Sequence, residues 1–288
     1  TGVQTCALPI LGQHLCKMLS EYSNIEVYTI DIINDSELYY ICADIRYNTL
    51  PKIKFDTVIH LAALVKVGES VNNPTEYYNT NINGTQRLLE ELNYDNFIFA
   101  STGAAENPTS PYALSKRVAE DIVAQLSDTY TIFRFYNVIG SDGFDQTNPD
   151  GLYYNLTKAS ERGLINVYGT DYNTPDGSCI REYIHVNDIC KSIIKAIYKP
   201  SNAIENLAYG EPKSVLEIIN IFKIVNNVEF AVNILPRRDG DPAEIYLTNQ
   251  SNYVIKSYTY EEMLKLWDVM NLMSFMNMNM AMSLTNNS

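Results

Sequence analysis

Positive charge is scarce in this chain. Its 288 residues include 21 Lys and Arg against 34 Asp and Glu, which gives a formal net charge of −13. Such a chain repels polyanions, which argues against nucleic acid or an anionic membrane as its main partner. An anionic small ligand would need cations placed locally around it. Long apolar runs are also absent, so the sequence predicts no membrane-spanning helix.

Cysteine is rare as well, and its five copies show no spacing typical of a metal site. We therefore expect free thiols in a reducing cytoplasm and no bound metal. No basic start followed by an apolar stretch indicates a signal peptide. Hydrophobic residues make up 46% of the chain and charged residues 19%, the balance of a globular protein with one or two domains.

What the sequence does contain is an alternation of apolar strands with amphipathic helices. The predicted strands cover residues 25–31, 55–63, 96–101 and 131–138, and the predicted helices cover 73–92 and 112–126. This order predicts βαβ units in an α/β fold, with a Rossmann-like doubly wound parallel sheet over residues 11–150. We expect a smaller C-terminal α/β substrate domain over 151–271 and a low-complexity tail over 272–288.

A tyrosine, a lysine and a threonine form the candidate catalytic group. Tyr112 and Lys116 lie one helical turn apart on one face of a predicted helix. That helix follows a strand ending in Ser101 and Thr102, at the rim of the sheet where ligands bind. A tyrosine, with an ordinary pKa of about 10, is a poor base at neutral pH, and a nearby ammonium favours its phenolate. The group predicts proton removal from an alcohol while a hydride leaves the same carbon.

Other residues of the same types have simpler interpretations. Tyr154 and Lys158 repeat the tyrosine–lysine spacing, but no strand-end hydroxyl precedes them, so we interpret this pair as a chance match. His60 lies in a buried apolar strand and is interpreted as a packed histidine rather than a catalytic one. His14 and His185 are also interpreted as packing or structural residues.

Asp31 is the candidate cofactor carboxylate. It ends the strand at 25–31, and Gly12 precedes it by the separation typical of the last glycine in a dinucleotide-binding turn. In such sites the carboxylate accepts hydrogen bonds from the ribose hydroxyls of NAD. An acid at this place favours NAD over NADP, because it repels a ribose phosphate.

Four ordered segments carry a family resemblance. The sequence reads "VIHLAALVKVGESVNNPTEYYNTNINGT", then "SPYALSK", "DGSCIREYIHVNDI" and "PRRDGDPA". These resemble successive motifs of the NAD-dependent epimerase/dehydratase family of extended short-chain dehydrogenases/reductases, and within it the UDP-glucose 4-epimerase-like members. The resemblance runs from about Gly12 to about Leu264.

The resemblance implies a set of site residues. For the cofactor NAD it implies Gly12, Asp31, Asp44, Ile45, Leu61, Ala62, Ala63, Ser101, Tyr112 and Lys116. For catalysis it implies Tyr112 as the base, with Lys116 and Thr102. For the UDP-sugar substrate it implies Thr102, Asn137, Asn155, Leu156, Arg181, Arg238 and Asp241. The arginines would oppose the repulsion between an acidic chain and an anionic ligand.

The implied activity is interconversion of UDP-glucose and UDP-galactose through a 4-keto intermediate, using bound NAD. Because many relatives are dimers, the resemblance also implies a homodimer. UDP-N-acetylglucosamine epimerisation is an alternative. A nucleotide-sugar 4,6-dehydratase is a second alternative, but those enzymes carry an Asp-Glu pair after the catalytic threonine, where this chain has Gly103 and Ala104. The third is an inactive chain that binds the UDP-sugar without turnover.

The first ten residues, "TGVQTCALPI", depart from the family pattern. Members of the family open with a buried strand and a glycine-rich turn, of which only Gly12 remains. The ten residues are also an in-frame translation of a common short-read sequencing adapter. We therefore interpret residues 1–10 as an artefact and expect the first strand to be missing. Pro9 and the polar Gln4 and Thr5 would be poorly suited to a central strand.

Overall fold

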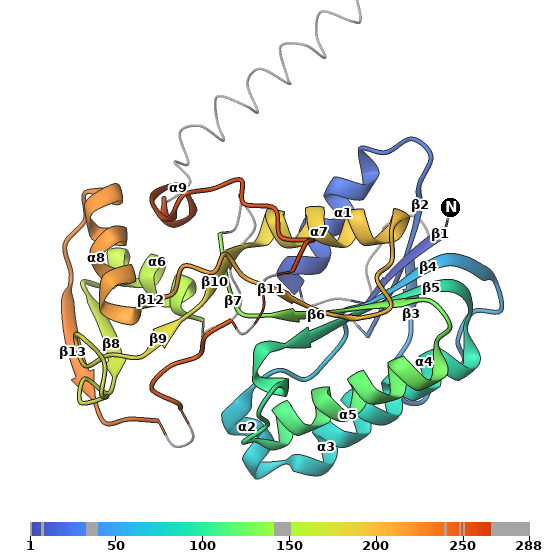
Figure 1. Cartoon of the computed structure of the whole chain (residues 1–288), viewed down its shortest axis with the longest axis horizontal. Helices are drawn as coiled ribbons and strands as arrows, with labels where there is room; N and C mark the ends of the chain where they lie inside the picture. The colour runs from blue at the N-terminus through green and yellow to red at the C-terminus, as the bar shows by residue number, and fades with distance from the viewer. Residues whose placement is uncertain are drawn as a thin grey trace, which may run out of the picture.

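A seven-stranded, all-parallel sheet forms the centre of the protein (Figure 1). The computed structural model describes residues 2–6, 9–32, 40–140, 151–238, 241–247, 249 and 251–265, with the backbone alone for residues before 11. The sheet order is β11-β6-β5-β4-β1-β2-β3. The strands are β1 (Gly2–Cys6), β2 (Glu26–Asp31), β3 (Tyr40–Cys42), β4 (Lys54–His60), β5 (Asn93–Thr102), β6 (Tyr130–Phe135) and β11 (Ile204–Leu207).

Helices cover both faces of this sheet (Figure 1). One face carries α1 (Pro9–Ser20) and α7 (Val186–Tyr198), and the other carries α4 (Gly84–Glu91) and α5 (Pro111–Leu126). Helix α1 forms because Leu11, Leu15 and Leu19 recur at helical spacing, and all three are buried against the sheet. The expected doubly wound α/β fold is confirmed.

The first strand is the main difference from expectation. We expected it to be missing, yet Gly2–Cys6 forms β1, which pairs in parallel with both β2 and β4. Pro9, which we judged unfit for a central strand, instead begins helix α1. The first helical position tolerates proline because its missing N–H has no partner inside the helix. The polar backbone of residues 2–6 is satisfied by the ladders on both sides.

The helix expected over 73–92 is divided into three parts. It consists of α3 (Pro74–Tyr78), a π-helical turn η1 (Asn79–Asn83) and α4. Within the turn, the buried Asn81 accepts from the Leu64 N–H at 2.9 Å and donates to the Leu64 carbonyl and the Ser115 hydroxyl, each at 2.9 Å. A π turn of this kind is common at functional sites. Here it anchors the loop that follows β4.

The chain beyond 150 builds a second, smaller lobe and also returns to the main sheet. The lobe contains α6 (Leu152–Arg162), β8 (Leu164–Tyr168), β9 (Ile180–Arg181), β12 (Lys213–Ser214), α8 (Val215–Asn226), β13 (Ala231–Leu235) and α9 (Tyr260–Leu264). The short strands β7 (Asn137–Ile139) and β10 (Tyr183–His185) pair where the two parts meet. Because β11 pairs with β6 in the main sheet and α7 packs against that sheet, residue 150 is not a clean boundary.

Two smaller elements lie in the first part of the chain, α2 (Val67–Asn72) and the single turn η2 (Gly103–Ala105). The predicted low-complexity tail, residues 272–288, lies outside the described residues. Within the ranges given above, no helix has both the length and the hydropathy needed to cross a bilayer.

Candidate active site

A pocket opens at the carboxyl ends of strands β2 and β4, on either side of β1. This is where the chain order of a doubly wound sheet reverses and where dinucleotides bind. The pocket is lined by Ile30, Asp31, Ile32, Ala43, Asp44, Ile45, Arg46, Ala62, Ala63, Leu64 and Thr80. Five of the residues that the resemblance implied for NAD therefore come together.

The lining has the chemistry that an adenosine needs. Asp31 supplies a carboxylate at the end of β2 for ribose hydroxyls, and Ile30 and Ile45 supply apolar walls for a planar base. Ala62 and Ala63 are small, so the backbone after β4 is open to close approach by a ligand. These residues fit NAD. Leu61, which precedes them, is only 1% exposed and packs in the core instead of facing the pocket.

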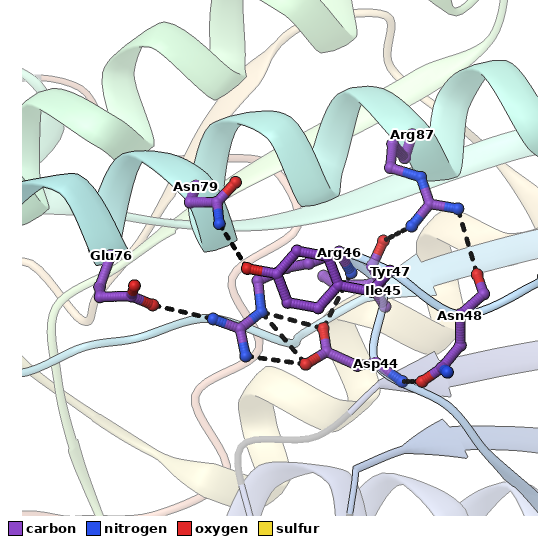
Figure 2. A network of polar contacts seen from close by, with 8 residues as sticks. All are labelled: Asp44, Ile45, Arg46, Tyr47, Asn48, Glu76, Asn79 and Arg87. Carbon is purple, nitrogen blue, oxygen red and sulfur yellow. Dashed lines mark hydrogen bonds and ion pairs between the residues drawn. The ribbon is translucent and has the colours of Figure 1, made fainter.

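Arg46 fixes Asp44 in place (Figure 2). Its guanidinium donates to both carboxylate oxygens of Asp44, from Nε at 3.0 and 3.1 Å and from Nη2 at 2.8 Å. Its Nη1 donates to Glu76 at 2.9 Å, which ties the pocket rim to α3. The Arg46 hydrogen bond is the main reason why the pKa of Asp44 lies below its ordinary value. Arg46 was not among the residues predicted from the sequence, although it lies only two residues after Asp44.

The backbone around Asp44 and Ile45 is held from two further sides. The Asn48 side chain accepts from the Asp44 N–H at 2.7 Å, and Arg87 of α4 donates to the Ile45 carbonyl at 2.9 Å (Figure 2). A turn fixed by three elements presents the same surface to a ligand each time, which lowers the cost of binding.

The candidate catalytic group lies beside this pocket, at the end of β5. Thr102 is the last residue of β5, and Tyr112 lies in the first turn of α5, which Ser110 caps by accepting from the Ala113 N–H. A hydrogen bond joins the side chains of Tyr112 and Thr102. The Tyr112 ring also meets Tyr77 edge-on, with centroids 6.4 Å apart. The structure thus brings the predicted base and the predicted threonine together.

Lys116 lies one turn further along α5 and is 3% exposed. Its Nζ lies 4.1 Å from the centroid of the Phe99 ring. Burial lowers the pKa of Lys116 to about 7, and Glu120 opposes that shift. Burial raises the pKa of Tyr112 to about 12, and only the Thr102 hydrogen bond lowers it. We expected the Lys116 ammonium to lower the pKa of Tyr112, but desolvation dominates both groups.

Ser101 has a partner other than the expected cofactor. Its hydroxyl donates to Glu120 at 2.5 Å, and Arg134 of β6 donates to the same carboxylate at 2.8 and 2.6 Å. All three side chains are buried. Sequence reasoning missed Glu120 and Arg134, although Glu120 continues the one-turn spacing of Tyr112 and Lys116 along α5.

The start of α1 is the weakest part of the predicted cofactor site. Gly12 is buried in the helix, as expected for close packing against the sheet. Ala7 and Pro9 stand where the two earlier glycines of a G-x-G-x-x-G turn would be. Pro9 is the first helical residue and has no N–H to offer a pyrophosphate at this helix end.

The residues implied for the UDP diphosphate form a second group, in the smaller lobe. Nη2 of Arg181 lies 3.7 Å from the Asp241 carboxylate, and the Asp241 N–H donates to the Arg238 carbonyl at 3.2 Å. The Arg238 guanidinium lies 3.9 Å from the centroid of the Tyr168 ring. Two arginines and one carboxylate are therefore neighbours, as a site for an anionic nucleotide requires.

Three other predicted substrate residues are not gathered into one site by their contacts. Asn137 on β7 donates to the Glu182 carbonyl at 3.0 Å. Asn155 on α6 donates at 2.9 Å to the carbonyl of Gly151, the residue just before the same helix. Leu156 is fully buried in the core.

The histidines have structural surroundings. His60 is 1% exposed, packs against Phe99 and lies 2.9 Å from the Thr85 hydroxyl through Nε2. His185 caps α7 by accepting from the Asn187 N–H, and its ring stacks on Tyr258. His14 is buried in α1.

Comparisons with known proteins agree with this geometry. A family model described as "NAD dependent epimerase/dehydratase family" matches residues 10–210. A UDP-glucose 4-epimerase from Haemophilus influenzae is 32% identical over 254 residues, which cover 76% of this chain and 73% of that protein. A UDP-arabinose 4-epimerase from Arabidopsis thaliana is 31% identical over 252 residues, covering 73% and 60%. The solved structure of a Bifidobacterium longum UDP-glucose 4-epimerase in complex with NAD⁺ and UDP is 27% identical, with a TM-score of 0.78 and coverage of 92% and 96%.

Proposed function

Because this chain belongs to the NAD dependent epimerase/dehydratase family, we propose that it is an isomerase that interconverts UDP-glucose and UDP-galactose with NAD as its cofactor. One observation carries the proposal most directly. The Tyr112 hydroxyl meets Thr102 at the end of β5, beside Lys116, and the neighbouring strand β4 leads into the pocket that contains Asp31.

In this proposal the side chains move one proton at the sugar 4-hydroxyl. Tyr112 takes the proton as a general base, and Thr102 holds the same oxygen by a hydrogen bond. Lys116 favours the phenolate form when it is charged. NAD held in the pocket that contains Asp31 would supply the acceptor for the hydride from C4 and the donor that returns it. The 4-keto sugar must turn between the two transfers, and Tyr112 then gives the proton back.

The turn after Thr102 argues against the dehydratase alternative. Gly103 occupies a position where an added Cβ would lie 2.6 Å from the Tyr136 ring. A carboxylate side chain cannot be placed there without moving that ring. Ala104 follows, so neither position offers the acid or base that loss of the 6-hydroxyl requires.

The substrate is tested by incubating the purified chain with NAD and four UDP-sugars. We expect UDP-glucose and UDP-galactose to reach the same mixture from either side, measured by proton NMR of the anomeric signals. Conversion of UDP-N-acetylglucosamine alone would instead favour the N-acetyl alternative. Conversion of UDP-arabinose alone would favour a pentose epimerase, an outcome to which the A. thaliana relative draws attention.

The altered turn at α1 keeps the inactive alternative open, and a double variant decides it. Ala7→Gly with Pro9→Gly restores the G-x-G-x-x-G spacing to Gly12 and returns an N–H to the helix start. If the chain as it stands carries no NAD, read as absorbance after borohydride reduction, the double variant should gain both NAD and turnover. A double variant that binds NAD and still leaves all four sugars unchanged would support a binding protein.

Two further expectations remain part of the proposal. We propose a cytoplasmic location, supported by the rarity of cysteine, of which the chain has five in 288 residues. We also propose a homodimer, by analogy with relatives; light scattering of the purified chain tests it, and a monomer at all concentrations would exclude it.

A further inference from the structure

Helix α5 presents a third functional side chain on the face that carries Tyr112 and Lys116. Glu120 follows Lys116 by one turn, so the three side chains lie along one stripe that faces β5 and β6. Glu120 is fully buried and Lys116 is 3% exposed. Two ionisable groups so far from water stay charged only if nearby groups stabilise the charges.

The Glu120 carboxylate is held by three donors from two strands. Ser101 of β5 donates to Oε1 at 2.5 Å, and Arg134 of β6 donates to Oε1 at 2.8 Å and to Oε2 at 2.6 Å. Ser101 and Arg134 are direct partners in the β5–β6 ladder, and Thr102 is the next residue after Ser101. The carboxylate therefore holds α5 against the end of β5, next to Thr102.

We propose that Glu120 is a positioning residue, which fixes the Tyr112–Lys116 face of α5 against the end of β5 and gives Lys116 its negatively charged neighbour. An ordinary structural ion pair would need only Arg134. The hydrogen bond from Ser101 and the one-turn spacing to Lys116 connect this pair to the reacting end of the helix.

Of the ionisable groups around Lys116, only Glu120 supplies a negative charge among the described residues. From β4, the buried His60 has its pKa held well below the ordinary value by burial and by Lys116, so it is neutral. From β5, Phe99 offers its ring face. Along α5, Tyr112 has a raised pKa and is uncharged at neutral pH, and from β6 the Arg134 charge is paired with Glu120. Among the described residues, Glu120 is the one carboxylate that raises the pKa of Lys116.

The test titrates Lys116 itself, so it does not depend on turnover. The full chain is labelled with ¹³C-lysine, and the Lys116 signal is the one missing from a Lys116→Arg variant. Glu120→Gln alone would leave the buried Arg134 unpaired and could prevent folding. The variant used is therefore Glu120→Gln with Arg134→Gln, which removes both charges together. Its titration should move to lower pH, because Glu120 raises the pKa of Lys116 and Arg134 is not among the groups that shift it.

Two controls make the result specific. Glu120→Asp keeps the charge, so Lys116 should titrate close to the wild-type value. Asp121→Asn removes the next carboxylate along the same helix, which is exposed and lies 3.6 Å from Arg117, and should leave Lys116 unchanged. An unchanged Lys116 titration in a folded double variant, or an equal shift in Asp121→Asn, would overturn the proposal.

The consequence for turnover rests on the proposed function and is measured separately. If the chain is an epimerase, the double variant should lose about tenfold in kcat with little change in KM, and the limb of the pH profile that Lys116 governs should move in the same direction as its titration. A chain that shows no epimerase activity would refute the proposed function, while the titration would still decide the role of Glu120. A normal kcat together with a shifted titration would overturn the catalytic half of the inference.

Discussion

Helices α5 and α6 carry the same tyrosine–lysine spacing in opposite surroundings. On α5, Lys116 is 3% exposed and Tyr112 meets Thr102 at a strand end. On α6, the Lys158 side chain is 34% exposed and its Nζ lies 3.1 Å from Glu161, in an ordinary surface ion pair next to Tyr154. The spacing places two side chains on one helix face in both cases. Burial and the preceding strand end distinguish the α5 face, which is the candidate catalytic face, from the α6 face.

The physical basis of the difference is desolvation. Inside α5, burial moves the pKa of Lys116 down to about 7 and that of Tyr112 up to about 12, so each group is less readily charged than in water. A bound ligand that interacts with either group can then change its protonation state strongly. On α6, water screens the Lys158–Glu161 pair, and such pairs contribute little.

The largest expected effect comes from removing the two phenolic hydroxyls in turn. Tyr112→Phe should lower kcat by a factor of about 10² to 10⁴, because it removes the general base, while NAD remains bound. Tyr154→Phe should stay within about twofold of wild type. The measurement is conversion of UDP-galactose to UDP-glucose at saturating substrate. Equal losses in the two variants would mean that the comparison between α5 and α6 selects the wrong tyrosine.

The sequence was sufficient to predict much of the first part of the fold. The strand ending at Asp31, the strand before Thr102 and the helix beginning near Tyr112 all form, because their apolar spacing agrees with what they pack against. The pocket that gathers Asp31, Asp44 and Ala62 follows from the parallel sheet, since its strands end at one edge.

Contacts between distant segments could not be predicted in the same way. The bidentate hold of Arg46 on Asp44 and the carboxylate of Glu120 against Arg134 depend on side-chain directions that no local pattern encodes. The return of β11 to the main sheet is also long-range, because it pairs with β6. Residues 2–6 form a strand in spite of their polar side chains, because their backbone pairs with a strand on either side.

A smaller effect is expected on the pH dependence of stability. The folded pKa of Lys116 is depressed to about 7 from an ordinary 10.5, so between these values the unfolded chain binds more protons than the folded one. The free energy of unfolding should therefore rise with pH over this window, by at most about 1.4 kcal/mol per pH unit from this group. The raised pKa of Tyr112 acts in the opposite direction only above about pH 10.

Urea unfolding at pH 7, 8 and 9 measures this slope in the cofactor-free chain. Lys116→Met should flatten it, because the titrating group is gone. Lys158→Met should run parallel to wild type, since that side chain remains partly exposed in its surface pair. If Lys116→Met keeps the wild-type slope, Lys116 is not the depressed group, and the contrast between the two lysines loses its electrostatic basis.

The smallest effect sharpens the comparison by assigning α6 a different task. If α6 contacts the nucleotide-sugar, Asn155→Ala should raise KM for UDP-glucose about tenfold, which corresponds to about 1.4 kcal/mol, and leave kcat unchanged. The reason is that a contact made equally in the ground and transition states affects binding alone, whereas the α5 side chains act on the reacting proton. The matched control is Asn72→Ala: Asn72 on α2 also donates to a carbonyl one turn back, that of Gly68, and its side chain is exposed. That control should change neither constant. A fall in kcat for Asn155→Ala with KM constant would place α6 in the chemistry after all, and the division of labour between the two helices would have to be abandoned.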